Sequence, residues 1–290
     1  MLRVAGPLAE VDDGGVTREV RVAPRLPGGP PVAGDHVTVD DSGTQGIIRG
    51  ISPRRTVLER VGSGGRVRAV VANADLLVVV AAVAEPPLVP RLIDRYAVAA
   101  VAGGLDLAVV LTKADRPHDA HAVAEVASRQ RAAGHRVVIG SALDPGLVGE
   151  VRGLIGDRLA VLAGHSGVGK STLTTALTGV QRATGAVSAR LRSGRHTTTD
   201  PRLIPMPGGG AVIDTAGVRS FWLPPMTPHD IAAGFPDIAS AAAACRFPDC
   251  RHMGDAGCAV DDSVDTERLA SYRALVEAAD SAARFARGRD

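Results

Sequence analysis

The sequence predicts a multidomain protein with an N-terminal all-β barrel of the OB type, a central doubly wound α/β domain and a mostly α-helical C-terminal domain. Residues 1–68 contain short apolar runs separated by glycine and proline turns. Residues 69–223 alternate buried-strand runs with helical segments, which is typical of a parallel sheet. Residues 224–290 contain alanine-rich helical segments on either side of a cysteine cluster. These three ranges are the expected domains.

Composition limits the class of protein. The chain of 290 residues is 45% hydrophobic but only 2% aromatic, so its core must consist of Ala, Val, Leu and Ile. The net charge of +2 excludes a global polycation, although a local basic patch can still bind nucleic acid. No signal-peptide pattern opens the chain, and the longest apolar run, residues 76–84, is too short to span a membrane. We expect a cytoplasmic, soluble monomer with no membrane association.

In the N-terminal range, residues 20–22, 36–39 and 46–49 read as strands. A small five-stranded barrel fits, and the OB-fold is the commonest such barrel with a nucleic-acid role. A β-module without that role fits this stretch equally well.

The central and C-terminal ranges have a clearer pattern. The expected central strands are residues 76–80, 107–111, 137–139, 159–163 and 211–213. The expected central helices are residues 92–101, 121–133, 145–155 and 171–177. Two more helices are expected at residues 231–244 and 266–286.

Lysine is scarce, and its positions are informative. Of 33 basic Lys and Arg residues only Lys113 and Lys170 are lysines. Arginine cannot replace a lysine where a site needs a compact point charge on a thin stem. Both lysines lie in nucleotide-binding signatures, which makes them candidate site residues.

The first signature is a phosphate loop between the strand 159–163 and the helix 171–177. Glycines let the loop backbone wrap phosphates, the lysine reaches the β- and γ-phosphates, and the serine is expected to hold Mg²⁺. A glycine-rich turn with an incidental lysine is the less favoured alternative. The loop consists of Gly164, His165, Ser166, Gly167, Val168, Gly169, Lys170, Ser171 and Thr172.

A second phosphate-side element follows the strand 211–213. Asp214 begins the sequence Asp-Thr-Ala-Gly, 44 residues after Lys170, where a Mg²⁺-binding aspartate belongs. Gly217 is placed to contact the γ-phosphate. Val218 occupies the position at which many GTPases orient water with glutamine, so we expect slow intrinsic hydrolysis that a partner completes.

The second lysine belongs to the predicted base-recognition loop Thr112, Lys113, Ala114 and Asp115, which closes the strand 107–111. A carboxylate at Asp115 accepts two hydrogen bonds from guanine N1–H and its exocyclic amine, a pair that adenine does not offer. The lysine stem packs along the base. The usual first residue is Asn, and Thr112 is expected to give less hydrogen-bond support. Ser141 and Ala142, after the strand 137–139, resemble the last guanine-side motif.

The order of these motifs is unusual. In an ordinary GTPase the phosphate loop comes first, whereas here the base-recognition elements precede it. The central domain is therefore predicted to be a circularly permuted P-loop GTPase domain, a change that is tolerated when the original termini lie close together. Its switch segments then lead directly into the C-terminal domain.

The chain's three cysteines lie within 14 residues, which in a cytosolic protein favours a metal site over disulfides. Cys245, Cys250, His252 and Cys258 supply three thiolates and one imidazole, a closed tetrahedral set that predicts one structural Zn²⁺. Buried cysteines with an unrelated histidine are the alternative.

Residues 181–202 are rich in arginine and poor in apolar side chains, and we expect them to be mobile without ligand. They form either a solvated charged loop or an rRNA-phosphate patch coupled to the switch. One of Thr197, Thr198 and Thr199 is expected to complete the Mg²⁺ shell, and His196 is the nearest polar candidate for catalysis.

The permuted order, the loop G-H-S-G-V-G-K-S-T-L, the run R-H-T-T-T at residues 195–199 and the cysteine cluster resemble the RsgA (YjeQ) family of small-subunit-dependent GTPases. The resemblance covers nearly the whole chain. It implies an N-terminal OB-fold, a permuted GTPase domain and a zinc domain. It also implies GTP/GDP binding with Mg²⁺, rRNA contacts, and hydrolysis stimulated by the small ribosomal subunit during its late maturation.

Two other functions fit the motifs. An RNA-binding assembly chaperone would use nucleotide mainly as a conformational ligand, and its weak hydrolysis would stay weak with ribosomes. A P-loop kinase or ATPase with a zinc module would prefer ATP and would be indifferent to Asp115→Asn.

Overall fold

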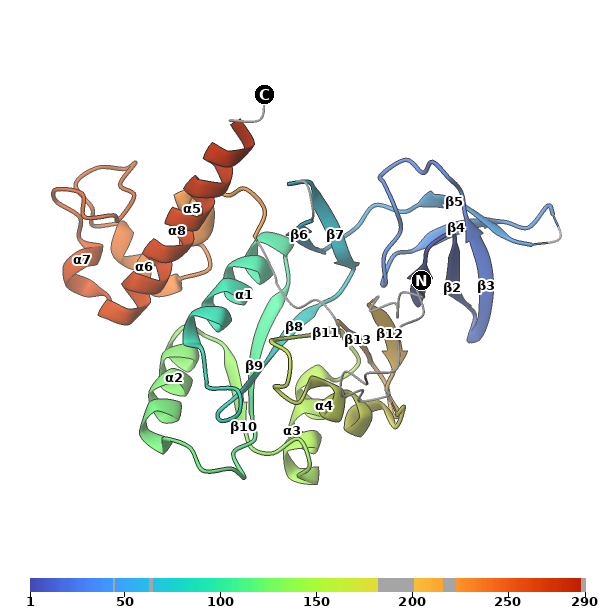
Figure 1. Cartoon of the computed structure of the whole chain (residues 1–290), viewed down its shortest axis with the longest axis horizontal. Helices are drawn as coiled ribbons and strands as arrows, with labels where there is room; N and C mark the ends of the chain where they lie inside the picture. Colours follow the sequence, from blue (N-terminus) through green and yellow to red (C-terminus); the bar gives the residue numbers. More distant parts are fainter. Residues whose placement is uncertain (44, 63–64, 182–200, 216–222, 288–290) are drawn as a thin grey trace, which may run out of the picture.

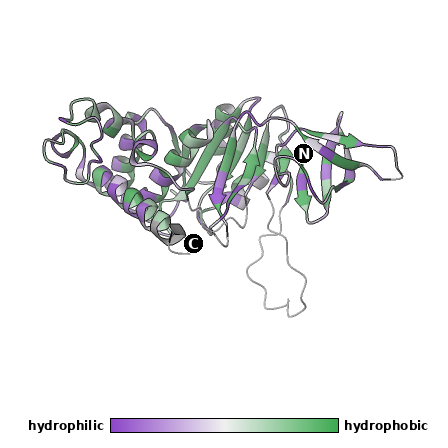
Figure 2. Ribbon diagram, turned by 90° about the horizontal axis from the view of Figure 1, so that it is seen from above, coloured by the Kyte–Doolittle hydropathy of each residue, from purple (hydrophilic) through white to green (hydrophobic). Residues whose placement is uncertain are grey.

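The computed structural model describes residues 1–43, 45–62, 65–181, 201–215 and 223–287. Figure 1 shows three parts in a row, with the N-terminal strands at one end, the α/β part in the middle and the C-terminal helices at the other end. The view from above in Figure 2 shows the same row, with hydrophobic residues concentrated on the central strands. Among the described residues, none of the helices combines the length and the apolar character that a membrane crossing requires.

The middle part is built on six strands that form one end of a larger sheet. They are β8 (Leu76–Ala82), β9 (Asp106–Thr112), β10 (Arg136–Ile139), β11 (Leu159–Ala163), β12 (Arg202–Pro205) and β13 (Ala211–Asp214). Their order is β10-β9-β8-β11-β13-β12, and all neighbours are parallel except β12 and β13. All seven residues of β8 are buried, as its unbroken apolar sequence predicts for a central strand covered on both faces.

Helices cover both faces of this sheet. They are α1 (Pro90–Gly103), α2 (Ala120–Ala132), α3 (Pro145–Ile155) and α4 (Lys170–Thr178). Helices α1 and α2 share one core with Leu77 and Val79, whereas α3 and α4 share the other with Val78 and Val80. The start of α2 has a cause in the sequence. The carboxylate of Asp119 accepts hydrogen bonds from the backbone amides of His121 and Ala122 in the first turn of this helix.

The N-terminal strands continue this sheet. They are β1 (Arg3–Ala5), β2 (Leu8–Asp13), β3 (Val16–Val22), β4 (Val37–Asp40) and β5 (Ile47–Ile51). Strand β1 pairs antiparallel with β12, with Arg3 opposite Arg202, so that eleven strands form a continuous sheet in the described residues. A separate two-stranded ladder joins β6 (Val57–Val61) to β7 (Val67–Ala72), and the boundary predicted at residue 68 falls inside β7.

Two local expectations were wrong. Arg202, which was included in the mobile segment, begins strand β12 and forms an ion pair with Glu10 at 3.2 Å. The single helix expected at residues 231–244 is divided into α5 (Pro228–Ala232) and α6 (Pro236–Ala242). The division has a sequence cause, because Pro236 cannot continue a helix and instead begins the second one.

The C-terminal part is completed by α7 (Val260–Ser263) and α8 (Thr266–Arg287). Its small core includes Phe235 and Tyr272, whose rings meet edge to face with centroids 5.7 Å apart. Val98 of α1 belongs to the same core, so the C-terminal helices pack directly on the α/β part.

Candidate functional site

The three nucleotide motifs meet at one edge of the sheet. The phosphate loop follows β11, the base-recognition loop follows β9, and Asp214 ends β13. These strands are parallel, so their carboxyl ends lie at the same edge, where open α/β sheets bind ligands. A Cβ atom built on Gly169 would lie 3.6 Å from the Thr112 hydroxyl and 4.0 Å from the Cβ of Ala142, so the phosphate loop lies against both the base-recognition loop and the segment of Ser141 and Ala142.

Glycine is required at two points of the phosphate loop. Gly164 has a φ of +146°, and a Cβ there would lie 2.0 Å from the carbonyl oxygen of Val80. Gly169 has a φ of +95° and precedes the first residue of α4. The loop backbone is therefore held close to β8 and turns sharply into the helix, which leaves its amides available to an anion.

Lys170 is buried at the centre of this loop. Its ammonium donates hydrogen bonds to the carbonyl oxygens of Gly164 and His165, each at 2.7 Å. Burial lowers the pKa of Lys170, and the nearby carboxylate of Asp214 partly opposes that change. A phosphate in the loop would supply the negative charge that this desolvated ammonium lacks.

Asp214 is fully buried beside the phosphate loop strand, where it pairs in register with Leu162. The next residue, Thr215, donates a side-chain hydrogen bond to the carbonyl of Leu162 at 2.7 Å and so fixes the end of β13. Ser171, the other predicted Mg²⁺ ligand, lies in the first turn of α4. The remaining candidates lie outside the described residues: His196, Thr197, Thr198, Thr199 and Gly217.

The base-recognition loop is tied to its neighbours by hydrogen bonds. The buried hydroxyl of Thr112 lies 2.6 Å from the carbonyl oxygen of Val168 and 3.2 Å from that of Ala81. The amide of Ala114 donates to the carbonyl of Gly140 at 3.1 Å, which connects this loop to the loop carrying Ser141. Thr112 therefore supports the phosphate loop directly, although it replaces the usual asparagine.

Lys113 and Asp115 complete the loop. The Lys113 ammonium donates a hydrogen bond to the backbone carbonyl of Glu85, and Asp115 is exposed. A cavity of about 600 Å³ opens between α3 and α4 and is lined by Ala142, Leu143 and Thr172 among others.

Sequence reasoning missed Tyr96. Tyr96 lies in the same core as Ala163, the residue before the phosphate loop, and burial raises the pKa of Tyr96 to about 12. Tyr96 lies on α1 and belongs to no nucleotide motif. The one available signal was its rarity, because the chain has only two tyrosines.

A second cluster lies in the C-terminal part. The ligand atoms of Cys245, Cys250, His252 and Cys258 all lie within 4.8 Å of one another. Nδ1 of His252 is 3.7 Å from Sγ of Cys245 and 3.5 Å from Sγ of Cys258. Tetrahedral coordination by sulfur and nitrogen gives separations of about 3.5 Å, so these residues can hold a metal ion.

Outer contacts fix the loop that carries these ligands. Arg273 donates to the backbone carbonyl of His252 at 2.8 Å, and the Tyr272 hydroxyl donates to that of Arg251 at 3.1 Å. The carboxylate of Asp255 accepts hydrogen bonds from the amides of Arg251 and Met253. Burial lowers the pKa of His252, which favours the neutral ring that binds metals.

Comparison with known proteins agrees with this geometry. The family model of the RsgA GTPase matches residues 51–224. The small ribosomal subunit biogenesis GTPase RsgA of Chromohalobacter salexigens is 40% identical over 255 residues, which cover 85% of this chain and 74% of the relative. The protein of the same name from Xanthomonas campestris pv. campestris strain B100 is 42% identical over 253 residues, covering 82% and 68%.

The chain belongs to the RsgA GTPase family. It is therefore a GTP hydrolase. Two solved structures have the same fold. YjeQ from Thermotoga maritima gives a TM-score of 0.71 at 22% identity and 95% coverage of both chains. YloQ, described as a circularly permuted GTPase, gives 0.70 at 22% identity, covering 97% of this chain and 94% of that one. The predicted permutation is thus confirmed.

Proposed function

We propose that this RsgA-family protein acts in late maturation of the small ribosomal subunit and that the subunit stimulates its GTP hydrolysis. The principal support is the match to relatives named small ribosomal subunit biogenesis GTPase, which extends over about three quarters of the first relative. The match includes residues far outside the phosphate loop, so it reflects more than a shared nucleotide motif.

We assign the nucleotide roles by chemistry. Asp115 selects guanine through its Watson–Crick edge, and the Lys113 stem packs along the base. The amides of residues 164–170 and the Lys170 ammonium hold the β- and γ-phosphates. Ser171 and Asp214 would hold Mg²⁺, together with one threonine of residues 197–199. When bound, Mg²⁺ neutralises charge on the β- and γ-phosphates.

Catalysis is proposed to depend on the partner. Val218 cannot orient a water molecule, so the chain alone is expected to hydrolyse GTP slowly. Gly217 is proposed to contact the γ-phosphate, and His196 is the chain's own candidate for a catalytic polar group. The subunit would then complete the geometry at the attacking water.

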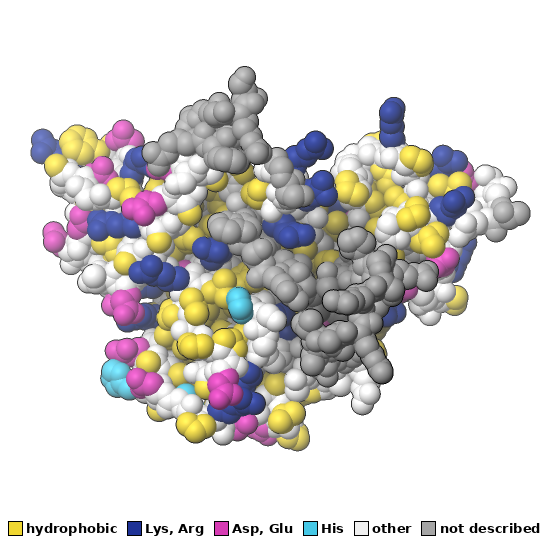
Figure 3. Space-filling model, viewed as in Figure 1, with side chains coloured by type: hydrophobic (Ala, Val, Ile, Leu, Met, Phe, Trp, Pro, Cys, Tyr) yellow, Lys and Arg dark blue, Asp and Glu magenta, His cyan; other side chains and the backbone are white. Residues whose placement is uncertain are grey.

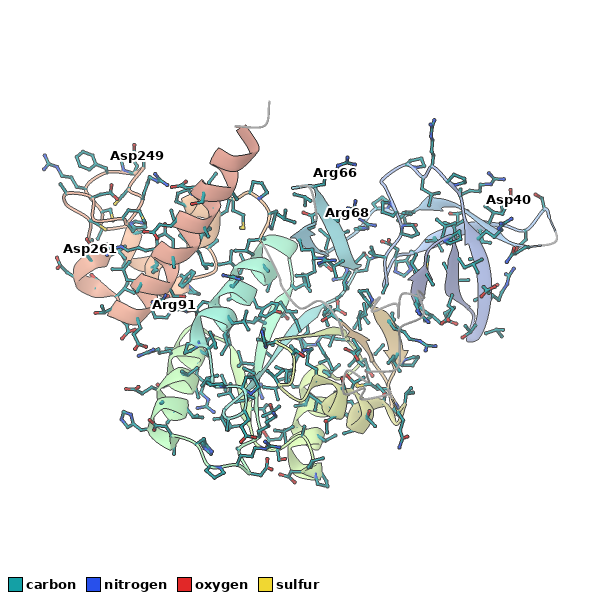
Figure 4. All side chains as sticks on the ribbon, viewed as in Figure 1. Asp40, Arg66, Arg68, Arg91, Asp249 and Asp261 are labelled. Atoms are coloured by element: carbon teal, nitrogen blue, oxygen red, sulfur yellow. The ribbon has the colours of Figure 1, made fainter. Side chains whose placement is uncertain are left out.

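The N-terminal part carries a feature that supports an RNA partner. Arg60 on β6 lies directly opposite Arg68 on β7, and Arg66 lies two residues before Arg68 (Figure 4). Like charges directly opposite one another destabilise a ladder. The ion pairs among the described residues include none of these three arginines. Figure 3 shows further basic side chains on the same face of the molecule, above the α/β part. RNA phosphates bound there would offset the repulsion between the arginine side chains.

The metal in the C-terminal part is proposed to be one Zn²⁺ with a structural role. Three thiolates and one imidazole form a closed donor set that zinc prefers and that leaves no position open for substrate. Bound zinc would supply folding free energy to a domain whose helices α5, α6 and α7 are short.

The test is hydrolysis of GTP and ATP with and without purified small subunits. We expect GTP-selective turnover that rises many-fold only with subunits, and Lys170→Ala serves as the inactive control. Turnover that ignores the subunit would contradict stimulation and favour an assembly chaperone that uses nucleotide as a conformational ligand. Equal or faster ATP turnover would contradict the base-site assignment.

A further inference from the structure

A row of charged side chains crosses the sheet from the nucleotide site to the N-terminal part. Arg202 of β12 lies directly opposite Asp214 of β13 and, on its other side, directly opposite Arg3 of β1. Glu10 of β2 lies opposite Arg3 in turn. These neighbouring strands are all antiparallel, and residues directly opposite one another carry their side chains on the same face. Figure 1 shows β12 beside the N-terminus.

This row lies on the face of the sheet that α3 and α4 cover. Ile204 lies opposite Val212, two residues from Arg202 and Asp214 along their strands. Both Ile204 and Val212 belong to the core that α3 and α4 share. Every second residue of a strand points to the same face, so Arg202 leaves β12 on the side where α4 follows the phosphate loop.

The side chain of Arg202 extends toward the N-terminal part. Its Nη2 lies 3.2 Å from Oε2 of Glu10, although Glu10 is two strands away. Neighbouring strands are about 4.8 Å apart, so this ion pair crosses over β1. Asp214 lies directly opposite Arg202 on the adjacent strand, which is well within the length of an arginine side chain. The carboxylate of Glu10 therefore determines which way the guanidinium points.

Glu10 is itself firmly held in the N-terminal part. Its backbone carbonyl accepts a hydrogen bond from the amide of Leu2 at 2.8 Å. The ammonium of Met1 donates to the backbone carbonyl of Asp35 at 3.0 Å, which fastens the start of the chain to the same part. Strand β1 pairs with β2 along its whole length, whereas its pairing with β12 is limited to one register position. The hold on Arg202 thus comes from the N-terminal side.

We propose that Glu10 is a positioning residue for Mg²⁺ binding, because it holds the guanidinium of Arg202 away from the carboxylate of Asp214. The inference rests on the proposed function of the site, in which Ser171 and Asp214 hold Mg²⁺. Hydroxyl and carboxylate oxygens are donors that suit this ion. A guanidinium turned toward Asp214 would bond to its oxygens and repel a divalent cation. The N-terminal part therefore keeps the metal end of the nucleotide site free.

The first experiment uses Glu10→Gln, which removes the charge and keeps the size of the side chain. Binding of guanosine 5′-(β,γ-imido)triphosphate is measured over a range of Mg²⁺ concentrations and in EDTA. The side chains of Arg202 and Glu10 are 44% and 30% exposed, so water screens the released charge. We expect the half-saturating Mg²⁺ concentration to rise roughly 2- to 5-fold, with wild-type affinity in EDTA. Equal Mg²⁺ dependence in Glu10→Gln and wild type would overturn the proposal.

The second experiment removes the cation as well. In the double variant Glu10→Gln, Arg202→Gln no guanidinium remains to turn toward Asp214, so we expect the half-saturating Mg²⁺ concentration to return to the wild-type value. An ion pair that only stabilised the sheet would leave the double variant at least as impaired as Glu10→Gln. A double variant that needs as much Mg²⁺ as Glu10→Gln would therefore overturn the role of Arg202 in the proposal.

Asp40→Asn is the matched control. It breaks the ion pair between Asp40 of β4 and Arg49 of β5, which also lies in the N-terminal part and has a similar separation of 3.3 Å. We expect wild-type Mg²⁺ dependence in this variant. A shift as large as that of Glu10→Gln would overturn the proposal, since any lost ion pair of the N-terminal part would then have the same effect.

These measurements use no ribosomes, which separates their outcomes from the test of the proposed function. Wild-type protein that binds the analogue equally well with Mg²⁺ and in EDTA overturns the proposed metal site and this inference together. Wild-type protein that responds to Mg²⁺, with Glu10→Gln responding equally, overturns the inference alone.

Discussion

The side-chain hydroxyl of Thr112 lies 2.6 Å from the backbone carbonyl oxygen of Val168, a residue 56 positions later in the chain. This contact joins the base-recognition loop to the phosphate loop. A hydroxyl has one proton to donate, and the shorter of its two contacts is the one to Val168. Thr112 is fully buried, so its hydroxyl bonds to protein rather than to water and connects the two loops.

Removing this hydroxyl should affect both stability and binding. We expect Thr112→Val to cost about 1–3 kcal/mol of unfolding free energy, because the buried carbonyl of Val168 loses its donor. Urea unfolding measures the loss, and titration with GDP measures the accompanying fall in affinity. Thr112→Ser keeps the hydroxyl and should retain most of both. A Thr112→Val protein with wild-type stability and affinity would show that the contact is unimportant.

Lys170→Ala should abolish GTP hydrolysis while leaving the fold intact. The ammonium is the positive charge that the loop offers to the β- and γ-phosphates, and alanine offers none. Turnover by phosphate release and the far-ultraviolet circular dichroism spectrum together provide the measurement. Wild-type turnover in this variant would refute the phosphate-loop assignment.

GTP affinity should weaken with rising pH in the alkaline range. The pKa of Lys170 lies below 10.5 because its ammonium is buried, so the nucleotide-free protein releases this proton at a lower pH than an ordinary lysine. GTP binds the ammonium form, so affinity falls as pH rises through the lowered pKa. Without nucleotide the sign is opposite for stability, since the burial penalty is present below that pKa and is relieved as pH rises toward 10.5. Calorimetric titration of GTP across alkaline pH measures the first effect.

Asp115→Asn should shift preference from GTP toward xanthosine triphosphate. The carboxylate accepts hydrogen bonds from guanine donors, whereas the amide can donate to the carbonyl that xanthine carries at the same position. Competition binding with the two nucleotides measures the shift. The exposed Asp144 offers a control, because Asp144→Asn changes a carboxylate at the N-terminus of α3 and should leave the nucleotide profile unchanged. An unchanged profile in Asp115→Asn would remove Asp115 from the base site.

Purified protein should contain one zinc ion per chain, and removing it should loosen the C-terminal part. Burial raises the pKa of the Cys258 thiol, so without metal this sulfur is protonated. The metal–ligand bonds that join the four residues are then absent. Elemental analysis measures the stoichiometry, and hydrogen exchange after chelation locates the loosening. Cys258→Ser should have the effect of the chelator. A metal-free protein with wild-type exchange in residues 245–260 would contradict a structural zinc site.

The sequence predicted those parts of the site that depend on local pattern. Lys170 and Asp214 follow apolar runs that could only be buried strands, so their place at the sheet edge was implied by the motifs themselves. Tyr96 and Asp94 could not be found in this way. Their surroundings depend on how α1 packs: Tyr96 lies in the same core as Ala163, and the partner of Asp94, Arg268, is 174 positions away in the chain.

The errors in the fold also have physical causes. Strand β12 was missed because it is short and ends in proline, and because it follows an arginine-rich stretch without strand periodicity. The helix expected at residues 231–244 was extended across Pro236 because alanine-rich sequence favours helix on both sides of it. The close approach of position 234 to Val98 explains why this position between the two helices is a glycine.

The pairing of β1 with β12 has a consequence for any shortened form of this protein. Leu203 donates its amide to the carbonyl of Leu2 at 2.9 Å, and Arg3 lies opposite Arg202. Deleting the N-terminal residues would remove β1, so β12 would become an exposed edge strand with unpaired backbone amides and carbonyls. Such edges recruit strands from other molecules and promote aggregation. We therefore expect a form without the first five residues to self-associate more readily than the whole chain.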